Sequence, residues 1–289
     1  MKILCATDLR PGTAVIERAQ WLARKLSGEL TVFHAVAPDE PRGLALEQRV
    51  WRADAHLRAR FDTATERPHL RVRVGDPGRR IAEIVNESAT DLVVLGASAR
   101  GASSRVFGRS IAERVLRDTR RPALIVRQDS AREYARVLIA LDVSSESAAA
   151  LRFAESLALT QEEITFLVHA YRPPYAGMLA SVGTRFDRID MQAEAWRQEF
   201  ETGVRQFLRR HSKDPWRYRL IMAVDRAVPG ILAVAERIQP DLLVLGTRAQ
   251  GLVLRTLTGS VGNEVADAAS CDVLLVPPRA AGPAEGTAA

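Results

Sequence analysis

The chain has 289 residues, of which 47% are hydrophobic and 26% charged, and its formal net charge is +6. This length suits two domains of ordinary size, and this composition excludes a disordered chain. The basic residues, nearly all arginines, are interspersed with Asp and Glu, which favours a solvated surface over a nucleic-acid interface, and no apolar run is long enough to span a membrane.

Ten short apolar runs alternate with amphipathic stretches along the chain. Such alternation is typical of βαβ units, which build a parallel sheet covered by helices. The predicted strands are residues 3–7, 30–36, 70–74, 92–95 and 123–126, followed by residues 137–141, 164–170, 218–223, 242–245 and 273–276.

A long helix is predicted between the second and third strands of each set of five. Apolar residues recur there at spacings of three or four residues or multiples of these, which indicates a helix with one face toward a core. The two apolar stripes consist of Leu46, Val50, Leu57 and Phe61, and of Trp196, Phe200, Val204 and Phe207.

The chain is a duplication. A shift of 150 residues places Gly96 on Gly246 without a gap across the loop that follows each. A unit of this size repeated twice indicates two similar domains rather than a solenoid. We therefore predict an α/β protein of two tandem doubly wound, Rossmann-like domains, each a five-stranded parallel sheet flanked by helices, over residues 1–130 and 135–278, with a disordered tail at 279–289. The residues that coincide include Asp91 with Asp241, Gly101 with Gly251, Arg105 with Arg255 and Ser110 with Ser260.

The beginning of the chain and its two cysteines bear on its location. The first predicted strand begins at Ile3, which leaves no room for a signal peptide, so we expect a cytoplasmic protein. Cys5 and Cys271 each lie in an apolar run, with no second Cys or His at metal-ligand spacing. We expect two buried, inert thiols and no metal site.

Two loops in each copy are expected to form a binding crevice. In a doubly wound sheet, ligands bind beyond the carboxyl ends of the strands where the winding reverses. This rule places Asp8 opposite the loop that begins at Gly96, and Asp142 opposite the loop that begins at Gly246. A carboxylate there can accept hydrogen bonds from a ribose or a base, and Ser260 opens a helix whose N-terminus attracts an anion.

Structural roles compete with binding roles at these positions. Ser110 and Glu113 form a capping box, so helix capping alone can explain that serine. Asp8 and Asp142 each end a strand and can satisfy turn amides. His34 and His169 lie in apolar strands, where a hydrogen-bonded core histidine is the expected role.

Familiar catalytic and nucleotide motifs are absent from the sequence. The glycines at the start of each loop have the Walker spacing, but Ala102-Ser103 and Leu252-Val253 stand where Lys-Ser/Thr is required. We find no HExxH, CxxC or GxSxG pattern. The sequence therefore predicts a binding protein rather than an enzyme, with weak ATPase activity left open.

The combination of an Asp, a His-containing strand and a glycine loop that ends in Gly-Ser resembles the universal stress protein family, in its tandem form. The resemblance spans Ile3 to Pro277 and implies that the Asp and the residue after the His contact an adenosine, while the Gly and Ser positions hold phosphates. For the second copy it implies a nucleotide site made by Asp142, Ala170, Gly246, Ala249, Gly259 and Ser260. Ala249 stands where the family has its second glycine, which is a small departure.

The first copy departs further from the family pattern. The resemblance implies a degenerate second site made by Asp8, Ala35, Gly96, Arg109 and Ser110. Arg109 stands where the family has glycine, and its side chain either fills the phosphate space or pairs with the anion as a clamp. Filling is the preferred interpretation.

Three functions are compatible with this reading. The first is a stress-response regulator that binds ATP or another adenine nucleotide, with or without Mg²⁺, in its second domain. The second is an interaction protein, or one that holds an apolar ligand, and binds no nucleotide. The third and least favoured is an ATP-cleaving or adenylate-forming enzyme. The resemblance also implies an intrachain pseudo-dimer or a homodimer, and neither a nucleic acid nor a membrane partner is expected.

Overall fold

The computed structural model describes residues 1–10, 14–38, 44–62, 67–97, 111–128, 132–159, 164–172, 186–247 and 261–278, without the side chains of residues 186–192. The chain divides into two compact units, which are considered separately below. The described elements of the first unit are β1 (Lys2–Ala6), α1 (Val15–Lys25), β2 (Glu29–Val36), α2 (Leu46–Arg60), β3 (His69–Val74), α3 (Pro77–Glu87), β4 (Leu92–Gly96), α4 (Ile111–Thr119), β5 (Ala123–Val126) and β10 (Asp272–Val276). Those of the second are β6 (Arg136–Ala140), α5 (Ser145–Ser156), β7 (Ile164–Tyr171), α7 (Phe186–His211), β8 (Arg219–Val224), α8 (Ala227–Ile238), β9 (Leu242–Gly246) and α9 (Val261–Ala268).

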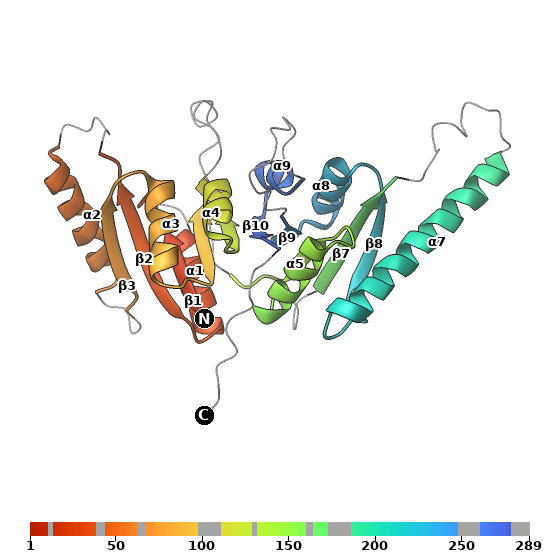
Figure 1. Cartoon of the computed structure of the whole chain (residues 1–289), viewed down its shortest axis with the longest axis horizontal. Coiled ribbons are helices and arrows are strands. Elements are labelled where there is room, and N and C mark those ends of the chain that lie inside the picture. Colours follow the sequence, from red (N-terminus) through yellow and green to blue (C-terminus); the bar gives the residue numbers. More distant parts are fainter. Residues whose placement is uncertain are drawn as a thin grey trace. The chain divides into compact units, whose positions relative to one another are not determined.

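The strands of both units form the expected doubly wound order (Figure 1). In the first unit the order is β3-β2-β1-β4-β5, and in the second it is β9-β6-β7-β8, with all of these pairs parallel. Central strands such as β4 and β9 are continuous runs of buried Leu and Val, because helices cover both faces of a parallel sheet. The α/β, Rossmann-like fold predicted for both copies is confirmed, and every predicted strand lies within one residue of its observed bounds.

The apolar stripes of the two long helices are only partly core. Leu57 and Phe61 are buried, but Leu46 is 37% exposed, so its predicted place in the core is wrong. Leu46 is the first residue of α2, and a side chain on the first turn can lie beyond the edge of the sheet that the helix covers. In the second unit Val204 and Phe207 are buried, whereas Trp196 and Phe200 are half-buried.

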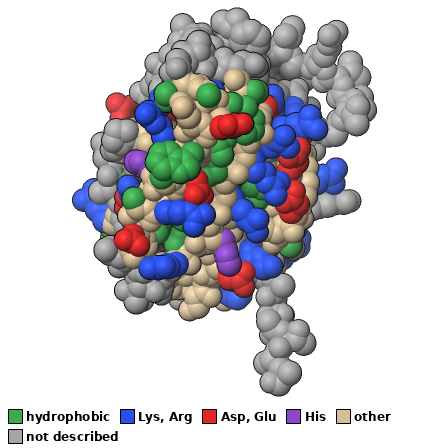
Figure 2. Space-filling view, turned by 90° about the vertical axis from the view of Figure 1, so that its left-hand side faces the viewer, with side chains coloured by type: hydrophobic (Ala, Val, Ile, Leu, Met, Phe, Trp, Pro, Cys, Tyr) green, Lys and Arg blue, Asp and Glu red, His purple; other side chains and the backbone are tan. Residues whose placement is uncertain are grey.

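The outer face of the first unit on the α2 side carries mixed charge (Figure 2). Lys and Arg side chains lie among Asp and Glu side chains there. The pairs include Arg58 with Asp54 on α2 at 2.5 Å, and Arg73 with Glu87 at 2.6 Å. These groups are largely exposed, and such pairs add little to stability.

The last strand of the chain belongs to the first unit. β10 pairs with β5 in the antiparallel direction, with Leu274 opposite Leu124, although the repeat assigns β10 to the second copy. The edge of the first sheet at β5 is therefore covered by a strand from the far end of the sequence.

A buried ion pair holds β10 in the first unit. Arg18 on α1 and Asp272 at the start of β10 are fully buried, with Nε and Oδ2 3.3 Å apart. The other oxygen of Asp272 accepts hydrogen bonds from the backbone N–H groups of Arg127 and Gln128, at 2.8 and 3.1 Å. Arg18 also donates from Nη1 to the carbonyl of Arg132, at 2.7 Å. The pair therefore anchors the segment that leaves the first copy as well as the last strand.

The aligned residues Asp91 and Asp241 have the same structural role in the two copies. Oδ2 of Asp91 accepts from the backbone N–H of Lys2 at the start of β1, at 2.8 Å. Oδ2 of Asp241 accepts from the backbone N–H of Arg136 at the start of β6, also at 2.8 Å. Asp91 thus ties the start of β4 to the start of β1, and Asp241 ties the start of β9 to the start of β6.

Breaking the buried ion pair should destabilise the protein far more than breaking an exposed one. We expect Asp272→Ala to lower the free energy of unfolding by about 3–5 kcal/mol, because it leaves the buried Arg18 charge without its partner. Asp118→Ala, which removes the largely exposed partner of Arg117, should change it by less than about 0.5 kcal/mol. Urea unfolding followed by circular dichroism measures both, and equal losses would contradict the assignment.

Candidate functional site

The candidate site lies at the carboxyl ends of β6, β7 and β9. These strands are parallel neighbours, with Ala140 opposite both Val168 and Leu245. The fold therefore brings three predicted residues to one edge of the sheet: Asp142 just after β6, Ala170 in β7 and Gly246 at the end of β9. In the first unit the same arrangement brings together the strand ends that carry Asp8, Ala35 and Gly96.

Five of the predicted site residues lie outside the described part of the chain. Their roles as phosphate or loop residues stay predictions. They are Ala249, Gly259 and Ser260 in the second copy, and Arg109 and Ser110 in the first.

The carboxylate of Asp142 is held in place by serines. Ser147 donates to Oδ1 of Asp142 at 2.7 Å, and the hydroxyl of Ser144 makes a short hydrogen bond to the same oxygen. Ser144 also caps α5, because its hydroxyl accepts from the backbone N–H of Ser147 at 3.2 Å. The carboxylate is thus built into the start of a helix, where the positive end of the helix dipole favours its charge.

The corresponding carboxylate of the first unit is held differently. Asp8 pairs with Arg10, at 3.2 Å between Oδ2 and Nε, and both side chains are more than half exposed. Oδ1 of Asp8 also accepts from the backbone N–H of Arg10, at 3.1 Å. The turn role considered for both Asp residues is therefore observed, and the described side-chain partners differ: Arg10 for Asp8, and the hydroxyls of Ser144 and Ser147 for Asp142.

A histidine fixes the backbone next to each carboxylate. Nδ1 of His169 lies 2.9 Å from the carbonyl oxygen of Leu141, and Nδ1 of His34 lies 2.8 Å from that of Thr7. A carbonyl only accepts, so Nδ1 carries the proton in both rings. The expected hydrogen-bonded core histidine is confirmed for buried His169, whereas His34 makes the same bond but is half-buried. In each copy the bond reaches the residue directly before Asp142 or Asp8.

The residue after each carboxylate adopts a left-handed backbone. Val143 has φ of 63° and Leu9 has φ of 60°. This region is unfavourable for residues other than Gly, Asn or Asp, and most of all for a β-branched residue such as Val. The strained turn directs the chain away from the sheet just beyond Asp142.

The first glycine of the two loops differs between the copies. A Cβ on Gly246 would lie 2.6 Å from the carbonyl carbon and oxygen of Glu146 and 2.9 Å from the nitrogen of Ser147. At Gly96 a Cβ would meet no described atom within 4 Å. Of the two glycines, Gly246 is therefore the one at which strand β9 comes too close to the start of α5 for a side chain.

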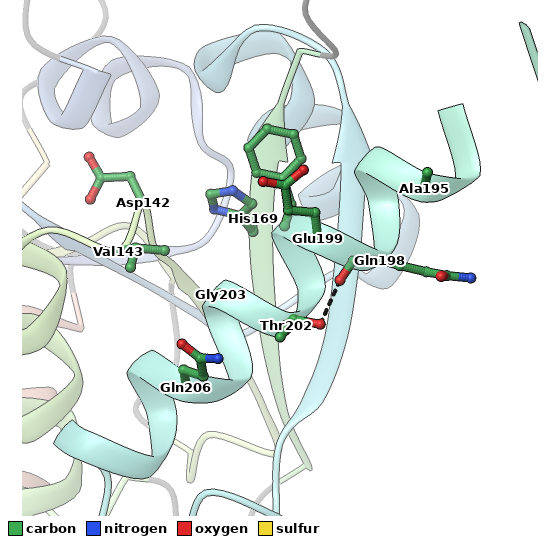
Figure 3. Close-up of a pocket in the computed structure, with 10 residues that line it drawn as sticks. Asp142, Val143, His169, Ala195, Gln198, Glu199, Thr202, Gly203 and Gln206 are labelled. Atoms are coloured by element: carbon green, nitrogen blue, oxygen red, sulfur yellow. Dashed lines mark hydrogen bonds between the residues drawn. The ribbon is translucent and has the colours of Figure 1, made fainter. Parts of the chain in front are cut away.

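A groove opens beside Asp142 in the second unit (Figure 3). Its volume is about 780 Å³, within the usual range for small-molecule sites. One wall is the strand edge and the other is α7. The lining residues are Asp142, Val143, His169, Ala195, Gln198, Glu199, Phe200, Thr202, Gly203 and Gln206. We call this the α7 groove.

The α7 wall was not foreseen as part of the site. The aromatic stripe of this helix was assigned to the core, but half-buried Phe200 lines the groove and packs against the ring of Tyr171, with centroids 4.7 Å apart. His169 lies 6.0 Å from Phe200 and 6.2 Å from Tyr171, so the three rings form a cluster. Burial raises the pKa of the Tyr171 phenol. The signal in the sequence that could have revealed this wall is Gly203, a glycine in the middle of a helix.

The outer face of α7 carries a ladder of ion pairs. Arg197 pairs with Glu194 at 2.8 Å and with Glu201 at 3.1 Å, and Arg205 pairs with Glu201 at 2.7 Å. The hydrogen bond from Arg197, followed by one from Gln198, lowers the pKa of Glu194 to about 2. The charged groups of Glu194, Arg197, Glu201 and Arg205 therefore pair with one another along the helix.

Metal and membrane sites were also considered for the described residues. Within them, no group of three or more His, Cys, Asp or Glu side chains is placed to hold a metal ion. No described helix is both long enough and apolar enough to cross a membrane. Cys5 and Cys271 are buried free thiols, and burial raises the pKa of Cys5 far above its usual value.

Comparisons with known proteins agree with the fold and the duplication. The model of the universal stress protein family matches residues 1–127 and again residues 133–277. A universal stress protein of Mycobacterium tuberculosis H37Rv is 29% identical over 205 residues, which cover 69% of this chain and 65% of the relative. The match therefore spans slightly less than two thirds of that relative's length.

Solved structures show the same fold at lower identity. A universal stress protein from Archaeoglobus fulgidus has a TM-score of 0.64 at 17% identity, covering 96% of each chain. The protein PA1789 from Pseudomonas aeruginosa, described as functionally unknown, also has a TM-score of 0.64 at 17% identity, covering 96% of this chain and 92% of its own. Both likenesses concern the fold alone.

The difference between the two loop glycines is testable by one substitution in each copy. Gly246→Ala should lower the free energy of unfolding by about 1–3 kcal/mol, because the new methyl group collides with backbone atoms of Glu146 that cannot rotate away. Gly96→Ala should change it by less than about 1 kcal/mol, since the space around it is open. Chemical unfolding of the two variants gives the comparison, and a larger loss at Gly96 would refute it.

Proposed function

The chain belongs to the universal stress protein family, and from this premise we propose that it is a stress-response regulator whose second unit binds an adenine nucleotide. The nucleotide is ATP or a related molecule, with or without Mg²⁺. It is held by Asp142, Ala170 and Gly246, together with Ala249, Gly259 and Ser260 of the adjoining loop. The cytoplasmic location expected from the sequence is part of the same proposal.

One observation carries the choice of the second unit. Asp142 is positioned by two serine hydroxyls and a helix start and borders a groove of about 780 Å³, whereas Asp8 is paired with Arg10. A carboxylate positioned at the border of a groove can accept hydrogen bonds from the ribose hydroxyls or the base amino group of a ligand there. The second copy also keeps glycine at position 259, where the first has Arg109.

The same geometry supports binding without turnover. The hydroxyls of Ser144 and Ser147 are committed to Asp142 and are therefore not held as nucleophiles by a neighbouring base. Among the described residues of the groove, none forms a pair of nucleophile and general base. We therefore propose a nucleotide-binding regulator rather than an enzyme.

Removal of the charge at Asp142 should weaken nucleotide binding selectively. Asp142→Asn keeps an oxygen that accepts from Ser144 and Ser147 but loses the negative charge, so ATP should bind about tenfold more weakly or worse. Asp8→Asn is the matched control and should bind ATP as the unmodified protein does. Titration calorimetry measures both. Equal effects of the two substitutions would contradict the assignment to the second unit.

The number of ATP sites per chain should depend on the residues at positions 259 and 109, which are Gly and Arg. We expect one ATP per chain, lost in Gly259→Arg and kept or doubled in Arg109→Gly, because only a residue without a side chain leaves space for phosphate at the helix start. ATP at about a hundred times its dissociation constant should stabilise the unit that binds it by roughly 2.7 kcal/mol, which thermal unfolding detects. Two sites in the unmodified protein, or loss of the site in Arg109→Gly, would recast Arg109 as a phosphate clamp.

A further inference from the structure

Gly203 is an unusual residue for its position. It lies in the interior of α7 and lines the α7 groove. Glycine destabilises a helix interior relative to alanine, and it is usually retained where another group comes too close for a Cβ. A Cβ on Gly203 would meet nothing within 4 Å, unlike a Cβ on Gly230 in α8, which would meet the Cβ of Ala170 at 3.2 Å. Packing among the described residues therefore does not explain Gly203.

His169 supplies an independent indication that the groove holds a ligand. The residue is 8% exposed, and it lines the groove (Figure 3). Its Nδ1 donates to the carbonyl of Leu141, so in this tautomer Nε2 is an acceptor. Among the described residues, no donor makes a hydrogen bond to Nε2. This acceptor lines the groove, where an N–H or O–H group of a ligand can reach it.

The polar groups of the groove select the kind of ligand group. The ten described lining residues include the carboxylates of Asp142 and Glu199 and no Lys or Arg, so the described part of the groove offers no cation to a phosphate. Thr202 donates its hydroxyl proton to the carbonyl of Gln198, and the amide nitrogen of Gln198 donates to Glu194. The carboxylates and Nε2 of His169 accept hydrogen bonds, and the side-chain amide of Gln206 can donate as well as accept. The ring of Phe200 adds an aromatic surface.

We propose that Gly203 keeps the α7 groove open for a flat, N–H-bearing heteroaromatic ring, the base of the bound nucleotide, and that Nε2 of His169 accepts a hydrogen bond from this ring. The inference rests on nucleotide binding by the second unit and adds where the base lies and what selects it. Gly203 is then a specificity-determining residue on a helix that sequence motifs do not mark.

Substitutions at Gly203 test the space, with a control on the same helix. Calorimetry of the full chain with ATP and with adenosine should show binding that is about tenfold weaker or worse in Gly203→Leu, because the side chain occupies the groove. Ala193→Leu makes a similar change at an exposed position of α7 that does not line the groove, and it should bind both ligands normally. Gly203→Ala should raise the melting temperature by a few degrees and still weaken adenosine binding, a combination that a purely structural glycine does not give.

Substitution of His169 and removal of the amino group from the ligand test the proposed hydrogen bond to Nε2. Purine riboside, which lacks the 6-amino group of adenosine, should bind the unmodified protein roughly fivefold more weakly than adenosine. His169→Asn keeps an N–H near the position of Nδ1 but has no acceptor at the position of Nε2, so it should bind adenosine and purine riboside equally. Retained discrimination in His169→Asn would overturn the role of Nε2.

The outcomes separate this inference from the proposed function. If the unmodified protein binds ATP, and Gly203→Leu binds both ATP and adenosine as tightly as the unmodified protein does, the placement of the base is wrong and nucleotide binding stands. If the unmodified protein binds neither ATP nor adenosine, the proposed function fails and the inference fails with it. Weaker binding in both Gly203→Leu and Ala193→Leu would show a general effect on α7 and would also overturn the inference.

Discussion

The buried ion pair between Arg18 and Asp272 is the interaction on which the first unit depends. Neither side chain has any exposure, and an unpaired charge at that depth costs several kcal/mol, so β10 is stable only where Asp272 meets Arg18. The backbone N–H groups of Arg127 and Gln128 and the carbonyl of Arg132 are bonded to the same pair. A single polar cluster thus fixes the end of β5, the segment that follows it and the last strand of the chain.

The candidate site depends on a different constraint, the common direction of parallel strands. Because β9, β6 and β7 run the same way, their carboxyl ends form one edge, and every residue that ends a strand is brought to it. Two local devices then give this edge its shape. The bond from His169 to the carbonyl of Leu141 sets the backbone before Asp142, and the close contact of Gly246 with the start of α5 brings the serines that hold its carboxylate.

Much of this arrangement follows from sequence pattern, and the remainder does not for physical reasons. Strand positions were predictable because continuous apolar runs have few alternatives to a buried strand. The placement of β10 was not, since a lone Asp272 in sequence does not reveal a buried Arg18 more than 250 residues away. The crevice was predictable from topology, whereas the α7 wall was not: half-buried Phe200 has the same apolar signature as buried Phe207, and only three-dimensional packing distinguishes them.

One local feature of the α7 groove is not explained by packing among the described residues. Gly203 lies inside the continuous helix α7, where alanine would be favoured by about 0.5–1 kcal/mol, although a Cβ there would meet no described atom within 4 Å. The left-handed turn at Val143 is different, because Leu9 has the same conformation at the corresponding position of the first unit, so the shared fold accounts for it. Substitutions that remove such a helix cost are easily found, and local rules are broken most often where a site must be kept open. Gly203 lines the groove beside Asp142, which is where such an opening is proposed.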